Sequence, residues 1–200
     1  TNISKSAYYV AFMAIGVTFV IATGGIDLSI GTVAICSALI GGTFMEKGAP
    51  MFVVILIMLL VGGIFGLING ILVSHFELPA FIATLGTMMV SRGLGSIVSQ
   101  TKTISFPQGN SAGAWFREIF MVTKDGGALP KNFPTGFILL AVCAVVMAIV
   151  LNKTRLGRYI LSIGSNKEAT RLSGIDVKKY ETLAYVFSGL FAALAGIAYV

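Results

Sequence analysis

Residues 152–181 read NKTRLGRYILSIGSNKEATRLSGIDVKKYE, and this polar segment lies between two apolar segments at 134–150 and 182–200. It carries seven basic and three acidic residues, which gives a net charge of +4. Lys and Arg accumulate in the cytoplasmic loops of helical membrane proteins. We therefore predict that 134–150 and 182–200 cross a membrane and that 152–181 is a cytoplasmic loop.

The predicted cytoplasmic loop contains the signals of a short helix at about 166–173. Ser165 and Glu168 have the spacing of a capping box, in which each side chain accepts a hydrogen bond from an N–H at the helix start. Gly174 suits the left-handed conformation that ends many helices. A capped helix in a cytoplasmic loop is expected to be presented to another molecule.

The surface of this short helix suits contact with a partner. Ala169 and Leu172 are three residues apart and form an apolar ridge, and Lys167 and Arg171 form a basic edge beside it. A ridge of this kind fits a groove in a second protein. The alternative is a solvated loop helix without a partner, because single amphipathic turns are common.

The composition indicates an all-α, polytopic transmembrane bundle. The chain has 200 residues, of which 56% are hydrophobic and 11% are charged. Soluble domains carry about 25% charged residues. The net charge of +6 is therefore interpreted as an orientation signal for membrane loops and not as a nucleic-acid-binding surface.

The apolar runs are long enough to cross a bilayer, which takes about 20 residues in a helix. We predict a single transmembrane domain, 1–200, with spans at about 7–23, 28–45, 51–73, 80–100, 134–150 and 182–200. Alternation from the cytoplasmic loop places the loop 102–133 outside the cell. The chain begins without Met and ends inside an apolar run, so we expect a fragment of a longer protein, truncated at both ends.

Small residues recur at the spacing that lets helices approach closely in lipid. They form two rows, Gly62, Gly66 and Gly70 in one span and Ser188, Ala192 and Gly196 in another. Such rows predict tight packing within the bundle or against a second copy. The two cysteines, Cys36 and Cys143, lie inside apolar runs and are interpreted as small buried hydrophobic residues.

Several segments occur together in a fixed order. They read GGIDLSIG at 24–31, LPAFIATLGT at 78–87 followed by Arg92, TRLGRY at 154–159, GSNKEATRLSGI at 164–175 and SGL at 188–190. Together they resemble the permease subunits of bacterial ABC sugar importers of the ribose/xylose/galactoside type. The signature positions are Gly24, Gly25, Asp27, Gly31 and Arg92.

The resemblance implies a type II ABC importer-like fold and a permease that forms the path for a pentose or hexose across the bacterial cytoplasmic (inner) membrane. It also implies a second permease copy, cytoplasmic ATPase subunits that bind ATP-Mg, and an external sugar-binding protein. The chain itself is expected to bind no cofactor and no metal. The ATPase-contact loop of the family corresponds here to Ser165, Asn166, Lys167, Glu168, Ala169, Arg171, Leu172 and Gly174.

A sugar path is expected to be lined by hydroxyls, amides and small residues. The span 80–100 places Thr84, Thr87 and Ser91 on one helical face, and Asn69 lies on the preceding span. We predict that these four residues line the path. The alternative is that they are polar contacts between helices, which are at least as common.

Two charged residues lie near the membrane interior. Asp27 follows two glycines and is predicted to cap the helix that begins after it, with direct sugar contact as the alternative. Arg92 is predicted to extend toward the external side of its span. The alternative is that it pairs with a carbonyl or lines an external vestibule.

The chain lacks the residues of an enzyme active site. It has one histidine, no phosphate-binding loop and no Cys/His cluster. We therefore predict that ATP hydrolysis resides on another subunit. The alternatives are an ion-coupled secondary transporter or channel, which tends to keep ionisable residues at mid-membrane, and a membrane-embedded enzyme, which the missing catalytic cluster disfavours.

Overall fold

The computed structural model describes residues 2–107, 113–120 and 135–200. Within these ranges the regular structure is helical. The helices are α1 (Asn2–Ala22), α2 (Ile30–Glu46), α3 (Met51–Ser74), α4 (Ala80–Ser99), α5 (Trp115–Phe120), α6 (Thr135–Lys153), α7 (Arg155–Ser165), α8 (Lys167–Leu172) and α9 (Val177–Tyr199).

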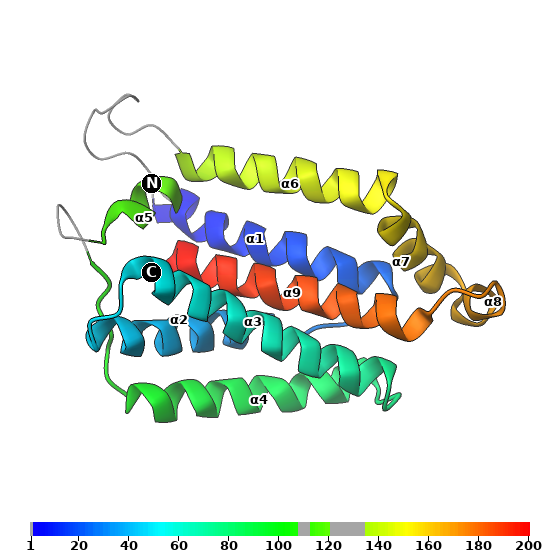
Figure 1. Cartoon of the computed structure of the whole chain (residues 1–200), viewed down its shortest axis with the longest axis horizontal. Helices are drawn as coiled ribbons and strands as arrows, with labels where there is room; N and C mark the ends of the chain where they lie inside the picture. Colours follow the sequence, from blue (N-terminus) through cyan, green and yellow to red (C-terminus); the bar gives the residue numbers. More distant parts are fainter. Residues whose placement is uncertain (1, 108–112, 121–134) are drawn as a thin grey trace.

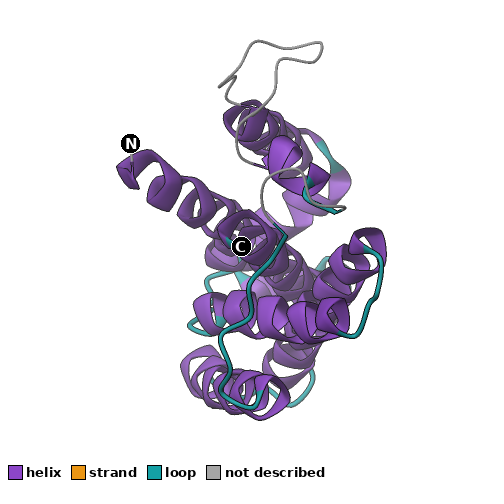
Figure 2. Ribbon diagram, turned by 90° about the vertical axis from the view of Figure 1, so that its left-hand side faces the viewer, coloured by secondary structure: helices purple, strands orange, loops and turns teal. Residues whose placement is uncertain are grey.

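The long helices lie side by side and form a bundle (Figure 1). Helix α9 runs through the middle, between α1 and α3, while α6 and α4 lie on opposite outer sides. In the end-on view of Figure 2, the chain end after α9 lies near the centre of the molecule. Helix α5 lies at one end of the bundle, and α7 and α8 lie at the other, so these are called the α5 end and the α8 end.

Helices occupy the six predicted spans, and four of them are long and apolar enough to cross a membrane. These four are α3, α4, α6 and α9, while Ala7–Ala22 and α2 are shorter apolar helices. Large apolar side chains such as Phe52 and Ile97 are exposed on the outside of the bundle. A bilayer covers such surfaces in a multi-pass membrane protein.

Glycines bring α3 and α9 into backbone contact. A Cβ atom on Gly62 or Gly66 would collide with backbone atoms of Gly189 and Tyr185 on α9. A Cβ atom on Gly70 would lie 2.8 Å from the Thr182 backbone, which is also too close. The predicted row of small residues on α3 therefore packs within the bundle, where the absent side chains allow close contact.

The predicted loop 152–181 contains an additional helix, α7, which the sequence analysis did not predict. Thr154 caps α7 by accepting a hydrogen bond from the N–H of Gly157 at 3.3 Å. Ile160 and Ile163 are buried on the inner face of α7, and Ile160 packs with Phe19 and Ala184. Helix α7 therefore packs against α1 and α9 and leads directly into α8.

Candidate functional site

Helix α8 begins one residue later than the predicted capping box requires. Asn166 is the N-cap, and its Oδ1 accepts a hydrogen bond from the N–H of Ala169 at 2.9 Å. The predicted capping box between Ser165 and Glu168 is wrong, because Ser165 is the last residue of α7. Gly174 follows α8 with a φ of +80°, which is the predicted left-handed end.

The outer surface of α8 carries the predicted apolar ridge. Leu172 is 83% exposed, and Ala169 is exposed beside it. Thr170, on the opposite face, is buried against the rest of the chain. A small cavity of about 290 Å³ separates α7 from α8, with Ser165 and Ala169 among its lining residues. One face of α8 therefore packs against the rest of the chain, and the other face is exposed.

The predicted basic edge of α8 is paired within the chain. Lys167 Nζ lies 3.0 and 2.8 Å from the two carboxylate oxygens of Glu181 on α9. Arg171 forms an ion pair with Glu168 at 3.1 Å, and both side chains of that pair are largely exposed. Lys167 thus attaches α8 to α9, while Arg171 remains largely exposed. That this basic edge meets a partner stays a prediction.

A buried polar network links four elements near the middle of the bundle. Asp27 Oδ1 accepts hydrogen bonds from the N–H and the hydroxyl of Ser29 at 2.9 and 2.7 Å, and Oδ2 accepts one from the Ser188 hydroxyl at 2.6 Å. Asn69 Nδ2 donates to the Ser29 hydroxyl at 2.8 Å, and the Thr87 hydroxyl donates to Asn69 Oδ1 at 2.6 Å. These bonds join the α1–α2 connection to α9, α3 and α4.

Asp27 therefore does more than begin a helix. Ser29 is the N-cap of α2, and it makes no side-chain capping bond. Asp27 accepts the N–H of Ser29 itself and reaches across the bundle to Ser188, 11 residues into α9. Asp27 thus accepts an N–H at the start of α2, as a capping residue does, and its second oxygen accepts from a hydroxyl on a neighbouring helix. Local sequence could not reveal these donors.

The four predicted path residues divide into two groups. Asn69, Thr84 and Thr87 are buried, and the hydroxyl of Thr84 donates to the carbonyl of Ala80 at 2.7 Å. Ser91 is also buried, but it lines an open cavity. All four residues therefore make polar contacts between or within helices, and among them Ser91 also lines an open cavity. That they line a sugar path stays a prediction.

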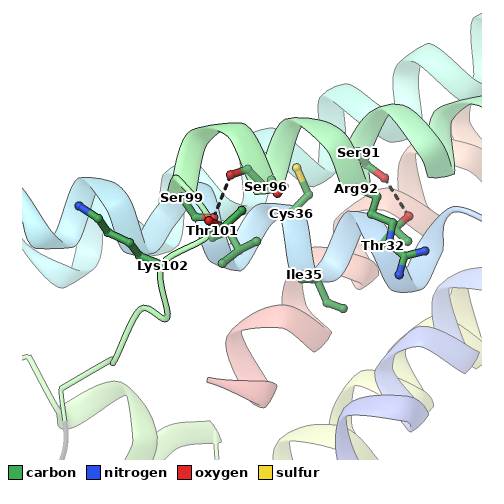
Figure 3. A pocket seen from close by; sticks show the side chains of 11 residues that line it. Thr32, Ile35, Cys36, Ser91, Arg92, Ser96, Ser99, Thr101 and Lys102 are labelled. Atoms are coloured by element: carbon green, nitrogen blue, oxygen red, sulfur yellow. Dashed lines mark hydrogen bonds between the residues drawn. The ribbon is translucent and has the colours of Figure 1, made fainter.

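The open space beside Ser91 is a cavity of about 540 Å³ between α2 and α4 (Figure 3). Thr32, Ser96 and Ser99 also line it, and the Ser91 hydroxyl donates to Thr32 at 2.8 Å. The sequence analysis missed these three residues. The sequence held a signal for the two serines on α4. Ser96 follows Arg92 by four residues and Ser99 follows Ser91 by eight, and such spacings place side chains near one side of a helix.

Arg92 also lines this cavity. Figure 3 draws its side chain on the Thr32 side of the cavity. A place in a cavity wall fits the alternative that Arg92 lines a vestibule. The predicted extension toward the external side of its span stays a prediction.

The predicted external loop 102–133 is partly described, through residues 102–107 and 113–120. Phe106 and Phe116 are buried and pack with Met51, Met58 and other residues at the α5 end. Arg117 donates a hydrogen bond to the carbonyl of Val200, and burial lowers the pKa of its guanidinium. Residues 108–112 and 121–133 of this loop lie outside the described residues.

Comparison with known proteins relates this architecture to a transport family. The family model described as "Branched-chain amino acid transport system / permease component" matches residues 1–200. The chain belongs to this permease family. Within the described ranges, no group of His, Cys, Asp and Glu side chains is arranged to hold a metal ion. No solved structure matches the chain.

Several curated relatives are named as sugar permeases. The chain is 39% identical over 191 residues to the fructose import permease protein FruG of Bifidobacterium longum, covering 96% of this chain and 56% of the relative. It is 34% identical over 196 residues to the ribose import permease protein RbsC of Haemophilus influenzae, covering 98% and 58%. It is also 34% identical over 196 residues to the galactofuranose transporter permease protein YtfT of Escherichia coli, covering 98% and 54%. The chain thus spans about half the length of these relatives.

Proposed function

We propose that this chain is the membrane core of a permease subunit of an ATP-binding-cassette importer that moves a monosaccharide across the bacterial cytoplasmic membrane. The observation that carries the proposal is the match, over nearly the whole chain, to permeases named for fructose and ribose import. The cavity between α2 and α4 has an apolar wall and a wall with several hydroxyls, which suits a small solute with both apolar and polar faces.

In this proposal the energy source is a separate subunit. Helix α8 contacts a cytoplasmic ATPase that binds and hydrolyses ATP-Mg, and the permease chain itself binds no cofactor. The exposed Leu172 ridge supports this contact, because a solvated face would ordinarily be polar. A second permease copy and an external sugar-binding protein complete the importer.

The proposed orientation places the α8 end in the cytoplasm and the α5 end outside. The polar segment 152–181 carries a net charge of +4 at the α8 end. Positive loops stay on the cytoplasmic side during membrane insertion. An impermeant thiol reagent applied to intact cells should therefore leave a single cysteine at Lys167→Cys unlabelled, in a background without other cysteines.

The functional proposal is tested by reconstituting the full-length permease with its ATPase and binding protein in liposomes. We expect uptake of radiolabelled D-fructose or D-ribose that requires ATP and the binding protein. Uptake that is driven by an ion gradient without ATP would support the secondary-transporter alternative. Uptake of L-leucine but of neither sugar would overturn the proposed substrate class.

A further inference from the structure

The cavity between α2 and α4 has two unlike walls. Helix α2 contributes mainly apolar side chains, including Ile35 and Leu39, together with the Thr32 hydroxyl. Helix α4 contributes Ser91, Ser96 and Ser99. The volume of about 540 Å³ lies within the range of about 300–1,000 Å³ that is usual for small-molecule sites. The cavity is therefore large enough for a solute and polar mainly on one side.

The second half of α4 directs its polar residues to this cavity, through Ser91, Arg92, Ser96 and Ser99, whereas Thr84 and Thr87 in the first half are buried and do not line it. Val90 and Ile97, which are 61% and 76% exposed, lie on the outer surface of the same helix. An apolar outer face suits lipid or further membrane helices. The hydroxyls beside the cavity therefore distinguish one side of this half of α4.

Two cations, Arg92 and Lys102, line the cavity. Arg92 is the only charged residue of α4, and it lies 12 residues after Ala80, or about 18 Å along the helix at 1.5 Å per residue. Among the described residues, no carboxylate forms an ion pair with Arg92, and none lines the cavity. The Arg92 side chain is exposed, so a solute in the cavity can reach it, and an ionisable side chain inside a membrane-spanning segment is typical of a functional site.

Resting on the function proposed above, we propose that this cavity binds a monosaccharide during transport and that Arg92 donates hydrogen bonds to the sugar oxygens. A guanidinium presents five N–H donors in a planar fork. The hydroxyls of Ser91, Ser96 and Thr32 both donate and accept, so they match sugar hydroxyls. A cationic solute is disfavoured because the described lining offers it no carboxylate. The same reasoning disfavours a zwitterionic amino acid, whose ammonium group would be unpaired.

The first test measures occupancy of the cavity directly. A single cysteine is introduced as Ser96→Cys in full-length permease that also carries Cys36→Ala and Cys143→Ala, assembled with its partner subunits. We expect millimolar D-fructose or D-ribose to slow alkylation of this cysteine severalfold, and L-leucine to have no effect. The control is Phe76→Cys, in the exposed turn between α3 and α4, whose alkylation should not respond to sugar.

The second test measures the role of Arg92 in transport. Arg92→Met should lower sugar uptake about tenfold or more, because hydrogen bonds to charged groups contribute about 1.5–3 kcal/mol. Arg92→Lys keeps the charge and should restore part of the uptake. Sugar protection at Ser96→Cys should weaken in the Arg92→Met background, which a merely structural role for Arg92 would not produce.

The outcomes separate this site from the proposed function. If the wild-type importer transports sugar but sugar never protects Ser96→Cys and Arg92→Met transports normally, the site is wrong and the function stands. If sugar is not transported at all, the proposed function itself fails. Protection by L-leucine and not by sugars would overturn the ligand class.

Discussion

Lys167 and Glu181 form an ion pair that ties α8 to α9, with Lys167 Nζ 2.8 and 3.0 Å from the two oxygens of the carboxylate. The Lys167 side chain is 51% exposed, whereas that of Glu181 is 8% exposed. Further along the same face of α9, the Tyr185 hydroxyl donates to the carbonyl of Ile26 at 3.3 Å, and Ser188 donates to Asp27. One face of α9 thus contacts both α8 and the α1–α2 connection.

We predict that reversing either charge of this pair harms the permease and that reversing both restores it in part. Glu181→Lys places a second cation beside Lys167 at a nearly buried position, at a cost of about 1–3 kcal/mol after allowance for the exposure of Lys167. The double variant Lys167→Glu with Glu181→Lys should recover most of the lost thermal stability and ATPase stimulation. The measurements are the unfolding midpoint in detergent and ATP hydrolysis by the assembled importer.

The exposed pair between Arg171 and Glu168 provides the matched control. Both side chains are about 70% exposed, so Glu168→Gln should change stability by about 0.5 kcal/mol or less. Equal effects at the two pairs would contradict a special role for Lys167. A double charge reversal that recovers nothing would show that Lys167 acts through a different partner.

Asp27 is predicted to stabilise the bundle through its three hydrogen bonds. Asp27→Ala leaves buried hydroxyls of Ser29 and Ser188 without their acceptor and should cost about 2–4 kcal/mol. Asp27→Asn keeps the shape and should cost less. Asp176 accepts one hydrogen bond from the N–H of Lys179 at the exposed start of α9, so Asp176→Ala should cost only about 1 kcal/mol. Comparable losses of the unfolding midpoint for the two alanine variants would argue against the buried network.

The α3–α9 contact predicts opposite outcomes at two adjacent glycines. Gly62 faces the backbone of Gly189, so Gly62→Ala must push the helices apart, at a cost of about 1–3 kcal/mol. An alanine Cβ at Gly63 would meet only the Leu190 side chain, at 3.5 Å. Gly63→Ala should therefore be neutral or stabilising by about 0.5–1 kcal/mol, because alanine favours the helix. Thermal unfolding of the two variants side by side tests the packing, and equal destabilisation would contradict it.

The sequence predicted the helices because their apolar runs are long and bounded by turns such as Gly48–Pro50. It also predicted the helix at α8, since its end signals are local. Helix α7 was missed because its basic residues obscured the apolar spacing of Leu156, Ile160 and Ile163. The partners of the polar residues are set by packing between distant segments. For that reason the sequence did not show that Asp27 also bonds to Ser188, or that Thr87 donates to Asn69.

The last prediction concerns Leu172, whose side chain is 83% exposed on α8. Because this residue contributes almost nothing to the packing of its own chain, Leu172→Asp should change the stability of the permease by less than about 0.5 kcal/mol. If α8 docks into a groove of the ATPase, the same substitution buries an unpaired carboxylate in the contact and should cost several kcal/mol of binding. We expect co-purification with the ATPase and sugar uptake to be lost together while membrane insertion is unchanged.

Two further variants make this result specific to the outer face of α8. Leu172→Met keeps an apolar side chain of similar volume and should retain uptake. Thr170→Asp, on the buried face, should instead lower the unfolding midpoint, because it places a charge inside the permease. Normal uptake and normal ATPase binding in Leu172→Asp would mean that α8 is a solvated loop helix and that the ATPase contacts another part of the α8 end.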